Sequence, residues 1–137
     1  MKRLLTAIAC VLAFAPAALA AGNIASQPTT LELAIDGRNL TFSTTTFELE
    51  TGKYYKLVIT SDGVEEVDVK APDLWENSWI NQLEINDVDV FVKGDFHIGF
   101  DSEGEATIFF VPLRPGNYTL FADGFEERGL AATFVVR

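Results

Sequence analysis

The chain closes with the stretch YTLFADGFEERGLAATFVVR, residues 118–137, and this stretch decides the predicted fold. Its first part alternates, so Tyr118, Leu120 and Ala122 are expected on one face of a strand. A short acidic loop follows, and the apolar run at 133–136 has the composition of a last strand. The order strand, short loop, strand therefore indicates a domain built from β-structure.

The same succession of short apolar runs and turns is found upstream, through most of residues 31–137. Short apolar runs end in turn residues, for example LELAI before Asp36 and Gly37, YYKLVIT before Ser61 and Asp62, and TIFFV before PLRPGN. No long helical pattern competes with them. Many short strands at this spacing are typical of an antiparallel sandwich or barrel. The sequence therefore predicts an all-β, antiparallel sandwich.

One stretch departs from this pattern, PDLWENSWINQLEIN at residues 72–86. Trp75, Trp79 and Leu83 follow helical spacing, and Asp73 with Glu76 three residues later resembles a capping box. We predict one short helix or compact loop over 72–84. Both tryptophans are expected to be packing groups, because large aromatic side chains are mostly buried. A surface role in partner binding is the alternative.

The N-terminus has the features of a secretory signal peptide. Lys2 and Arg3 precede a mostly apolar run, and ALA at 18–20 suits a signal peptidase. We expect a signal peptide at 1–20, a flexible leader at 21–30 and one domain at 31–137, located in the periplasm. A lipoprotein signal at Cys10 is disfavoured, because a larger apolar residue is needed where Ala7 stands.

The charge balance and the cysteine count exclude several classes of function. Ten basic residues less Lys2 and Arg3 leave eight, against twenty acidic residues, so the mature chain carries a net charge of −12. Such a surface repels nucleic acid and anionic lipid, and no membrane insertion of the mature chain is expected. Cys10, the only cysteine, leaves with the signal peptide, which excludes a disulfide or a thiolate metal site. No catalytic motif is recognisable.

Four stretches together resemble the cupredoxin superfamily, and the resemblance covers most of residues 31–137. They are FELETGKYYKLVIT at 47–60, SDGVEEVDV at 61–69, FFVPLRPGNYTLFA at 109–122 and RGLAATFVV at 128–136. The resemblance implies a Greek-key sandwich, cupredoxin-like in its strand order. It also implies where copper ligands would stand.

At the positions where the resemblance implies copper ligands, this chain has residues of other types. Glu65 stands near the first histidine, Ala122 at the cysteine, Glu126 or Glu127 near the second histidine, and Leu130 at the methionine. A blue-copper centre needs imidazoles, a thiolate and a weak axial thioether. We therefore expect no type 1 copper and no blue-copper electron carrier, with Ala122 and Leu130 filling the core instead.

Within the superfamily, the pattern is nearest to periplasmic cupredoxin-like proteins associated with bacterial high-affinity iron permeases. Those proteins also lack the cysteine and end in an acidic, aromatic loop after a Pro-Gly-x-Tyr turn, as RPGNYTLFADGFEE does. The present chain has Glu where they tend to carry His, and a longer tryptophan-bearing insertion. The resemblance implies an iron or copper ion as cofactor and a membrane permease or periplasmic protein as partner. Catalysis is not predicted, because oxidation of ferrous iron would need an external electron acceptor.

The candidate metal ligands are Glu65, Asp123, Glu126 and Glu127, expected at one end of the sandwich. Alternation would put Glu65 on the same, core-facing side as Val67, at the inner rim of the sandwich. Converging carboxylates repel one another, and a hard or borderline cation would relieve that repulsion. A solvated acidic loop is the alternative.

His97 is the single histidine, and alternation with Ile98 and Phe100 directs it toward solvent. It could join a carboxylate site, but an ordinary surface histidine is favoured.

Two functions follow from these patterns. The first is a metal-handling accessory that binds iron or copper through carboxylates for uptake or for transfer to a partner. The second is a metal-free degenerate cupredoxin that serves as a protein-binding module or subunit of a periplasmic complex. In that case Trp75 and Trp79 would form the contact surface, since exposed aromatic residues mark interfaces.

Overall fold

Alternation of apolar and polar residues builds the strands of this structure, a computed structural model that describes residues 27–86, 89–91 and 96–137. In β4, Tyr55, Leu57 and Ile59 are buried while the residues between them are half-buried. This period of two gives each strand one face for the core and one for the surface. The predicted signal peptide at 1–20 lies outside the described residues.

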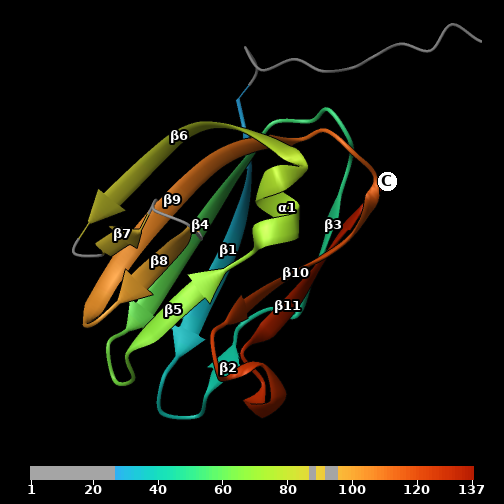
Figure 1. Cartoon of the computed structure of the whole chain (residues 1–137). Coiled ribbons are helices and arrows are strands. Elements are labelled where there is room, and N and C mark those ends of the chain that lie inside the picture. The colour runs from blue at the N-terminus through green and yellow to red at the C-terminus, as the bar shows by residue number, and fades with distance from the viewer. Residues whose placement is uncertain (1–26, 87–88, 92–95) are drawn as a thin grey trace, which may run out of the picture.

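Two sheets pack face to face in the described part of the chain (Figure 1). The first sheet has the order β2-β1-β4-β9-β6, and the second has the order β3-β11-β10-β5-β8-β7. The strands of the first sheet are β1 (Thr29–Asp36), β2 (Thr41–Phe42), β4 (Tyr55–Asp62), β6 (Ser78–Asn86) and β9 (Glu103–Pro112). Those of the second are β3 (Thr46–Leu49), β5 (Val67–Lys70), β7 (Asp89–Phe91), β8 (His97–Phe100), β10 (Gly116–Ala122) and β11 (Ala131–Val136).

The predicted all-β sandwich is confirmed, with two refinements. Most neighbouring strands are antiparallel, but β1 pairs with β4 in parallel, and β3 pairs with β11 in parallel. Both sheets are therefore mixed. The first strand begins at Thr29, two residues before the expected start of the domain at 31.

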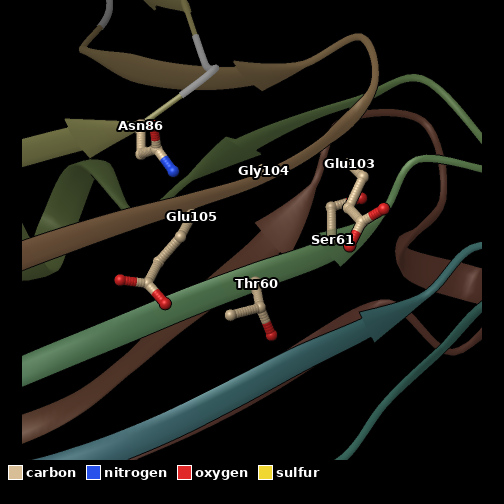
Figure 2. A pocket seen from close by; sticks show the side chains of 6 residues that line it. All are labelled: Thr60, Ser61, Asn86, Glu103, Gly104 and Glu105. Carbon is tan, nitrogen blue, oxygen red and sulfur yellow. The ribbon is translucent and has the colours of Figure 1, made fainter.

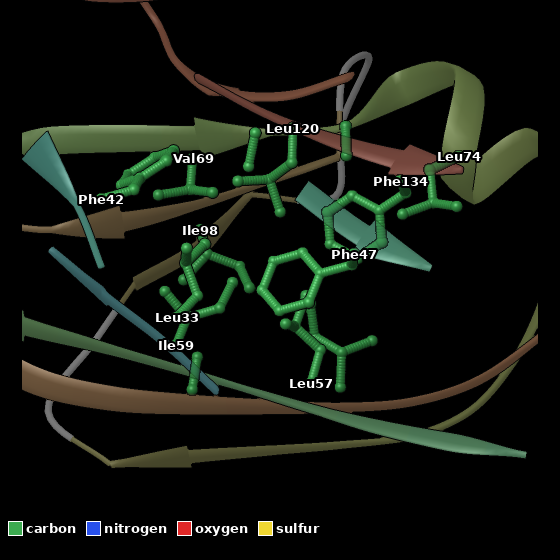
Figure 3. Close-up of a cluster of buried hydrophobic side chains, with 14 of the residues drawn as sticks. Leu33, Phe42, Phe47, Leu57, Ile59, Val69, Leu74, Ile98, Leu120 and Phe134 are labelled. Carbon is green, nitrogen blue, oxygen red and sulfur yellow. The ribbon is translucent and has the colours of Figure 1, made fainter. Parts of the chain in front are cut away.

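The core lies between the sheets and is filled by large aliphatic and aromatic side chains (Figure 3). Phe47 from β3 and Phe134 from β11 stack with ring centroids 4.8 Å apart. Ala122 and Leu130 are both fully buried members of this core, as expected. Burial of apolar surface on this scale is the main force that holds two sheets together.

The segment 72–84 contains a short helix, but the helix ends early. Helix α1 spans Pro72–Glu76, and its buried Leu74 closes the core beside β10 and β6. The capping-box prediction was wrong: Ala71 is the N-cap, and no side chain caps the helix. Pro72 starts the helix instead, because its fixed φ suits the first turn.

From Ser78 to Asn86 the chain is strand β6, so the helical spacing of Trp79 and Leu83 was misleading. Nearly the whole of β6 pairs antiparallel with β9, with a register shift between Ile80 and Gln82. The residues of β6 include isoleucines and a tryptophan, which favour extended backbone. A short helix in this segment would be marginally stable, because few hydrogen bonds offset the cost of ordering the backbone. Pairing with β9 supplies backbone hydrogen bonds along the strand instead. Among the described helices, neither is long enough and apolar enough to span a membrane.

Candidate functional site

The predicted metal ligands belong to loops at one end of the sandwich, the lower end in Figure 1. Glu65 lies in the loop between β4 and β5, and the other three lie in the loop of residues 123–130 between β10 and β11. The turn between β1 and β2, residues 37–40, lies at the same end. The shared end was expected, so the question is whether these loops bring the carboxylates together.

The loop 123–130 is closed by its own backbone. The Ala122 amide donates to the Leu130 carbonyl at 3.0 Å, and the Phe125 amide donates to the Ala122 carbonyl at 2.9 Å. A 3₁₀ turn, η1 (Glu126–Arg128), completes it. Glu126 and Glu127 are exposed there. The fold thus anchors the loop through main-chain bonds and the buried Leu130, and leaves both carboxylates in solvent.

Asp123 is held by a cation of the protein itself. The Lys70 ammonium on β5 lies 2.7 Å from the Asp123 carboxylate Oδ2. The Asp123 amide also donates to the Asp68 carbonyl at 2.9 Å. An ion pair of this length is a charge-assisted hydrogen bond. A metal ion at Asp123 would therefore have to displace or share the lysine.

Glu65 lies before the first residue of β5 and is exposed, so its predicted place at the inner rim was wrong. Alternation holds for the buried Val67 and Val69 but does not extend into the loop. The backbone of Glu65 packs against the turn between β1 and β2. A β-carbon on Gly37 would come within 2.7 Å of the Glu65 nitrogen.

The other side of that turn contacts the loop 123–130. A β-carbon on Gly129 would come within 3.0 Å of the Leu40 carbonyl oxygen. Residues 37–40 thus touch both acidic loops and lie between them in Figure 1. This placement explains why the Glu65 carboxylate does not join those of Glu126 and Glu127.

Hydrogen bonds make this intervening turn rigid. The Asn39 amide nitrogen donates to Asp36 Oδ1 at 2.9 Å, and the Asn39 side chain donates to Oδ2 at 2.7 Å. These bonds, the side-chain bond most of all, hold the pKa of Asp36 below its ordinary value. Asp62 Oδ1 accepts from the amides of Gly37 and Val64, which ties the turn to the β4–β5 loop.

Within residues 27–86, 89–91 and 96–137, no group of three or more His, Cys, Asp or Glu side chains is close enough to hold a metal ion. The predicted cluster of Glu65, Asp123, Glu126 and Glu127 is therefore not assembled. The same residues include no cysteine and one histidine, so they do not supply a type 1 copper ligand set.

His97 lies on the outer face of the second sheet, among charged residues. Its Nε2 is 3.9 Å from Asp68 Oδ1, and it pairs across the strands with Lys70. It is half-buried rather than fully directed to solvent. His97 therefore lies beside an acidic and a basic residue of β5.

The two tryptophans have different surroundings. Trp75 packs edge-on against Phe96 and Phe110, with ring centroids 6.1 and 5.6 Å away, at the border of the core. Trp79 on β6 keeps 42% of its surface exposed. The packing interpretation therefore fits Trp75, whereas Trp79 is the tryptophan with an exposed surface that a partner could contact.

Sequence reasoning missed a hollow on the outer face of the first sheet. Asn86 of β6, Glu105 of β9 and Thr60 of β4 are cross-strand neighbours, and their side chains line a hollow of about 390 Å³ (Figure 2). Hollows of about 380 and 210 Å³ adjoin it, share Glu105 with it, and add Glu32 and Glu84. Alternation already directs Glu105 and Glu84 outward, but their proximity depends on the pairing of β6 with β9.

Comparisons with known proteins find a likeness in structure and none in sequence. No protein-family model and no curated protein matches the chain. Reduced auracyanin from Roseiflexus castenholzii is 16% identical, with a TM-score of 0.58 over 82% of this chain and 99% of auracyanin. Auracyanin A from Chloroflexus aurantiacus, a "blue" copper protein, is 12% identical, with a TM-score of 0.56 over 81% and 100%.

A laccase from Pediococcus acidilactici is 9% identical, with a TM-score of 0.61, and the match covers 85% of this chain and 28% of the laccase. At such low identities the likeness extends to the fold and not to the site. The described part of the chain is a cupredoxin-like β-sandwich.

Proposed function

We propose that this cupredoxin-like domain acts outside the cytoplasm as a protein-binding module, and that strand β6 is its contact surface. The observation that carries the proposal is the exposure of apolar side chains along one strand. Trp79, Ile80 and Ile85 are exposed by 42%, 37% and 46% of their surface. All three belong to β6, which lies at the edge of the first sheet.

Such a concentration of exposed apolar residues has a cost in water. Scattered surface isoleucines are common in monomers, but several along one edge strand are typical of an interface. Tryptophan is the residue most enriched among those that dominate binding energy. Trp79 pairs with Val111 on the outer side of the sheet, whereas Ile85 pairs with Ala106 on the core-facing side. A partner that contacts both sides of this edge would remove both side chains from water and gain the corresponding free energy.

The location outside the cytoplasm rests on the N-terminal sequence. Lys2 and Arg3, the apolar run after them and the small residues at 18–20 support export by a signal peptide. The partner would then be a periplasmic protein or the exposed part of a membrane permease.

Site-specific photo-crosslinking in the source cell tests the proposal. A benzophenone-bearing amino acid replaces Trp79 in one variant and Val64 in a control variant. Val64 is also apolar and 53% exposed, but it lies in the β4–β5 loop and not on β6. We expect one discrete adduct with another protein from position 79 and none from position 64. An adduct from position 64 alone would contradict the proposal and would indicate that the β4–β5 loop, and not β6, contacts the partner.

Capture of a transition-metal cation for uptake or transfer is the second candidate. It is favoured by the common end of the two acidic loops and by a mature net charge of −12, which attracts cations. Ligation by Glu65 with Glu126 would require the loops to approach one another across the turn at 37–40, whereas Asp123 would have to leave Lys70.

Thermal unfolding with ferrous iron, copper, manganese or calcium tests this candidate. A cation that binds only the folded state must raise the Tm. Metal handling by these carboxylates predicts a rise at micromolar metal that is lost in the double variant Glu65→Ala with Glu126→Ala. An unchanged Tm with every cation would eliminate the candidate and leave the protein-binding proposal untouched.

A further inference from the structure

Strand β6 has one paired edge and one open edge in the described structure. It pairs with β9 from Ser78 to Asn86, and no described strand lies on its other side. An edge strand presents alternate N–H and C=O groups that a further strand can pair with. Extended peptides bind to sheets in this way in many complexes.

Natural edge strands are usually protected by lysine, proline, bulges or inward-pointing charges. β6 has no lysine and no proline, and Glu84 is its only charged residue. Its one irregularity is the register shift between Ile80 and Gln82, where the Asn81 side chain donates to the Tyr54 hydroxyl at 2.7 Å. From Gln82 to Asn86 the pairing with β9 is regular. This half of the strand is therefore open to strand addition.

The register with β9 determines what each side of β6 presents. Leu83 pairs with Ile108 and Ile85 with Ala106, so Leu83 and Ile85 share the core-facing side of the sheet. Ile85 is nevertheless 46% exposed, unlike the fully buried Ile108 on the same side of the sheet. An added strand would need apolar residues on this side.

From Gln82 to Asn86, the opposite side of β6 is polar and acidic. Glu84 pairs with Thr107, and Asn86 pairs with Glu105, so both carboxylates lie on the outer face of the sheet. They line the adjoining hollows there, together with Glu103. An added strand would direct every second side chain toward this acidic surface. Lysine or arginine at those positions would complement its charge.

We infer that β6 binds, by strand addition, an extended partner segment in which apolar and basic residues alternate. This inference rests on the proposed function and specifies its binding mode and the chemistry of the partner. A second copy of the same chain fits poorly. Two β6 strands side by side would bring both Glu84 carboxylates to one outer face, between two molecules of strongly negative charge.

The test uses the mature chain and a synthetic peptide of about ten residues in which valine and lysine alternate, long enough to span β6. A peptide of alternating valine and glutamate is the control. Calorimetry measures affinity, and amide hydrogen exchange measures protection of residues 78–86. We expect binding of the lysine peptide only, with slower exchange in 78–86 and no change in 123–130.

Two matched variants separate recognition at β6 from attraction by net charge. Glu84→Lys and Glu127→Lys change the total charge equally, and both residues are exposed. Glu84→Lys should weaken peptide binding by about tenfold or more, whereas Glu127→Lys should change it by less than about twofold, because charges far from an interface are screened by salt.

Three outcomes would overturn the inference: equal loss in both variants, binding without protection of 78–86, or protection of 78–86 that rises with protein concentration in the absence of peptide. The last would assign the edge to a second copy of the chain. If Trp79 crosslinks to a partner but the lysine peptide does not bind, strand addition fails while the proposed function stands. If neither occurs, both fail.

Discussion

Gly63 lies where the backbones of two loops meet. Its φ of +66° is left-handed, and a β-carbon there would collide with the backbone of Ser102 and Glu103. Two separate features therefore require glycine here: the left-handed backbone conformation and the close approach of the β8–β9 turn. We predict that Gly63→Ala lowers the free energy of unfolding by more than about 2 kcal/mol, measured by urea denaturation.

Gly124 provides the matched control for this substitution. Its φ of +79° is equally left-handed, but a β-carbon there would have no neighbour within 4 Å. Gly124→Ala should therefore lose only the conformational preference, about 1 kcal/mol. Equal losses for the two variants would mean that the contact between the loops contributes nothing at Gly63.

Asp36 gives a prediction about pH. Because hydrogen bonds from Asn39 hold its pKa below the ordinary value, the ionised carboxylate stabilises the folded state at neutral pH. That contribution is lost as the pH falls through the acid range below the unfolded-state pKa. We predict that Asn39→Ala moves the pKa of Asp36 upward in an NMR titration. The variant should also lose more stability at neutral pH than in acid, and an unmoved pKa would contradict the assignment.

At the scale of elements, the junction of α1 and β6 gives the two tryptophans different roles. Trp75→Ala should lower the free energy of unfolding by about 2–4 kcal/mol, because it removes contacts with Phe96 and Phe110 and leaves a cavity at the border of the core. Trp79→Ala should cost less than the Trp75 substitution, about 1 kcal/mol, because 42% of the Trp79 surface is already exposed and the residue lies outside the core. Chemical denaturation of both variants measures the difference, and the reverse order would refute this assignment.

The same junction shows the limit of local sequence patterns. Strands such as β4 and β10 were predictable, because alternation and turn residues are local signals. Helix α1 was predictable as a short element, but its end was not. The spacing of Trp75, Trp79 and Leu83 is compatible with one continuous helix. It is equally compatible with a short helix followed by a strand. Pairing with β9 determines that residues 78–86 form a strand. The β9 partners of Trp79 and Leu83 are Val111 and Ile108, far along the sequence.

For the site, the sequence predicts a cluster of four carboxylates, whereas the described residues contain no group of three or more acidic, histidine or cysteine side chains that could hold a metal ion. Ala122 and Leu130 lie in the core as expected, Ala122 from its alternation with Tyr118 and Leu120, and Leu130 from the resemblance that places it at the methionine position. The positions of the carboxylates depend on three loops and on a lysine from β5 that pairs with Asp123. The free edge of β6 was also beyond local prediction, since an edge exists only relative to the order of the whole sheet.

At the scale of the whole molecule, charge dominates the response to salt. The chain's formal net charge of −10 makes the folded surface repel itself, and salt screens that repulsion. Raising sodium chloride from about 10 mM to about 0.5 M should raise the Tm by a few degrees. The double variant Glu126→Gln with Glu127→Gln should show a smaller rise. A Tm that falls with salt would mean that ion pairs such as Lys70 with Asp123 outweigh the repulsion.

The central claim is that the functional surface is the β6 side of the sandwich and not the loop end. The amide NMR spectrum of the mature chain, titrated with the valine–lysine peptide, tests it most directly because it locates binding residue by residue. The account predicts shifts concentrated in residues 78–86 and in the facing residues 105–109 of β9. Shifts concentrated in residues 62–66 and 123–130 instead would contradict it.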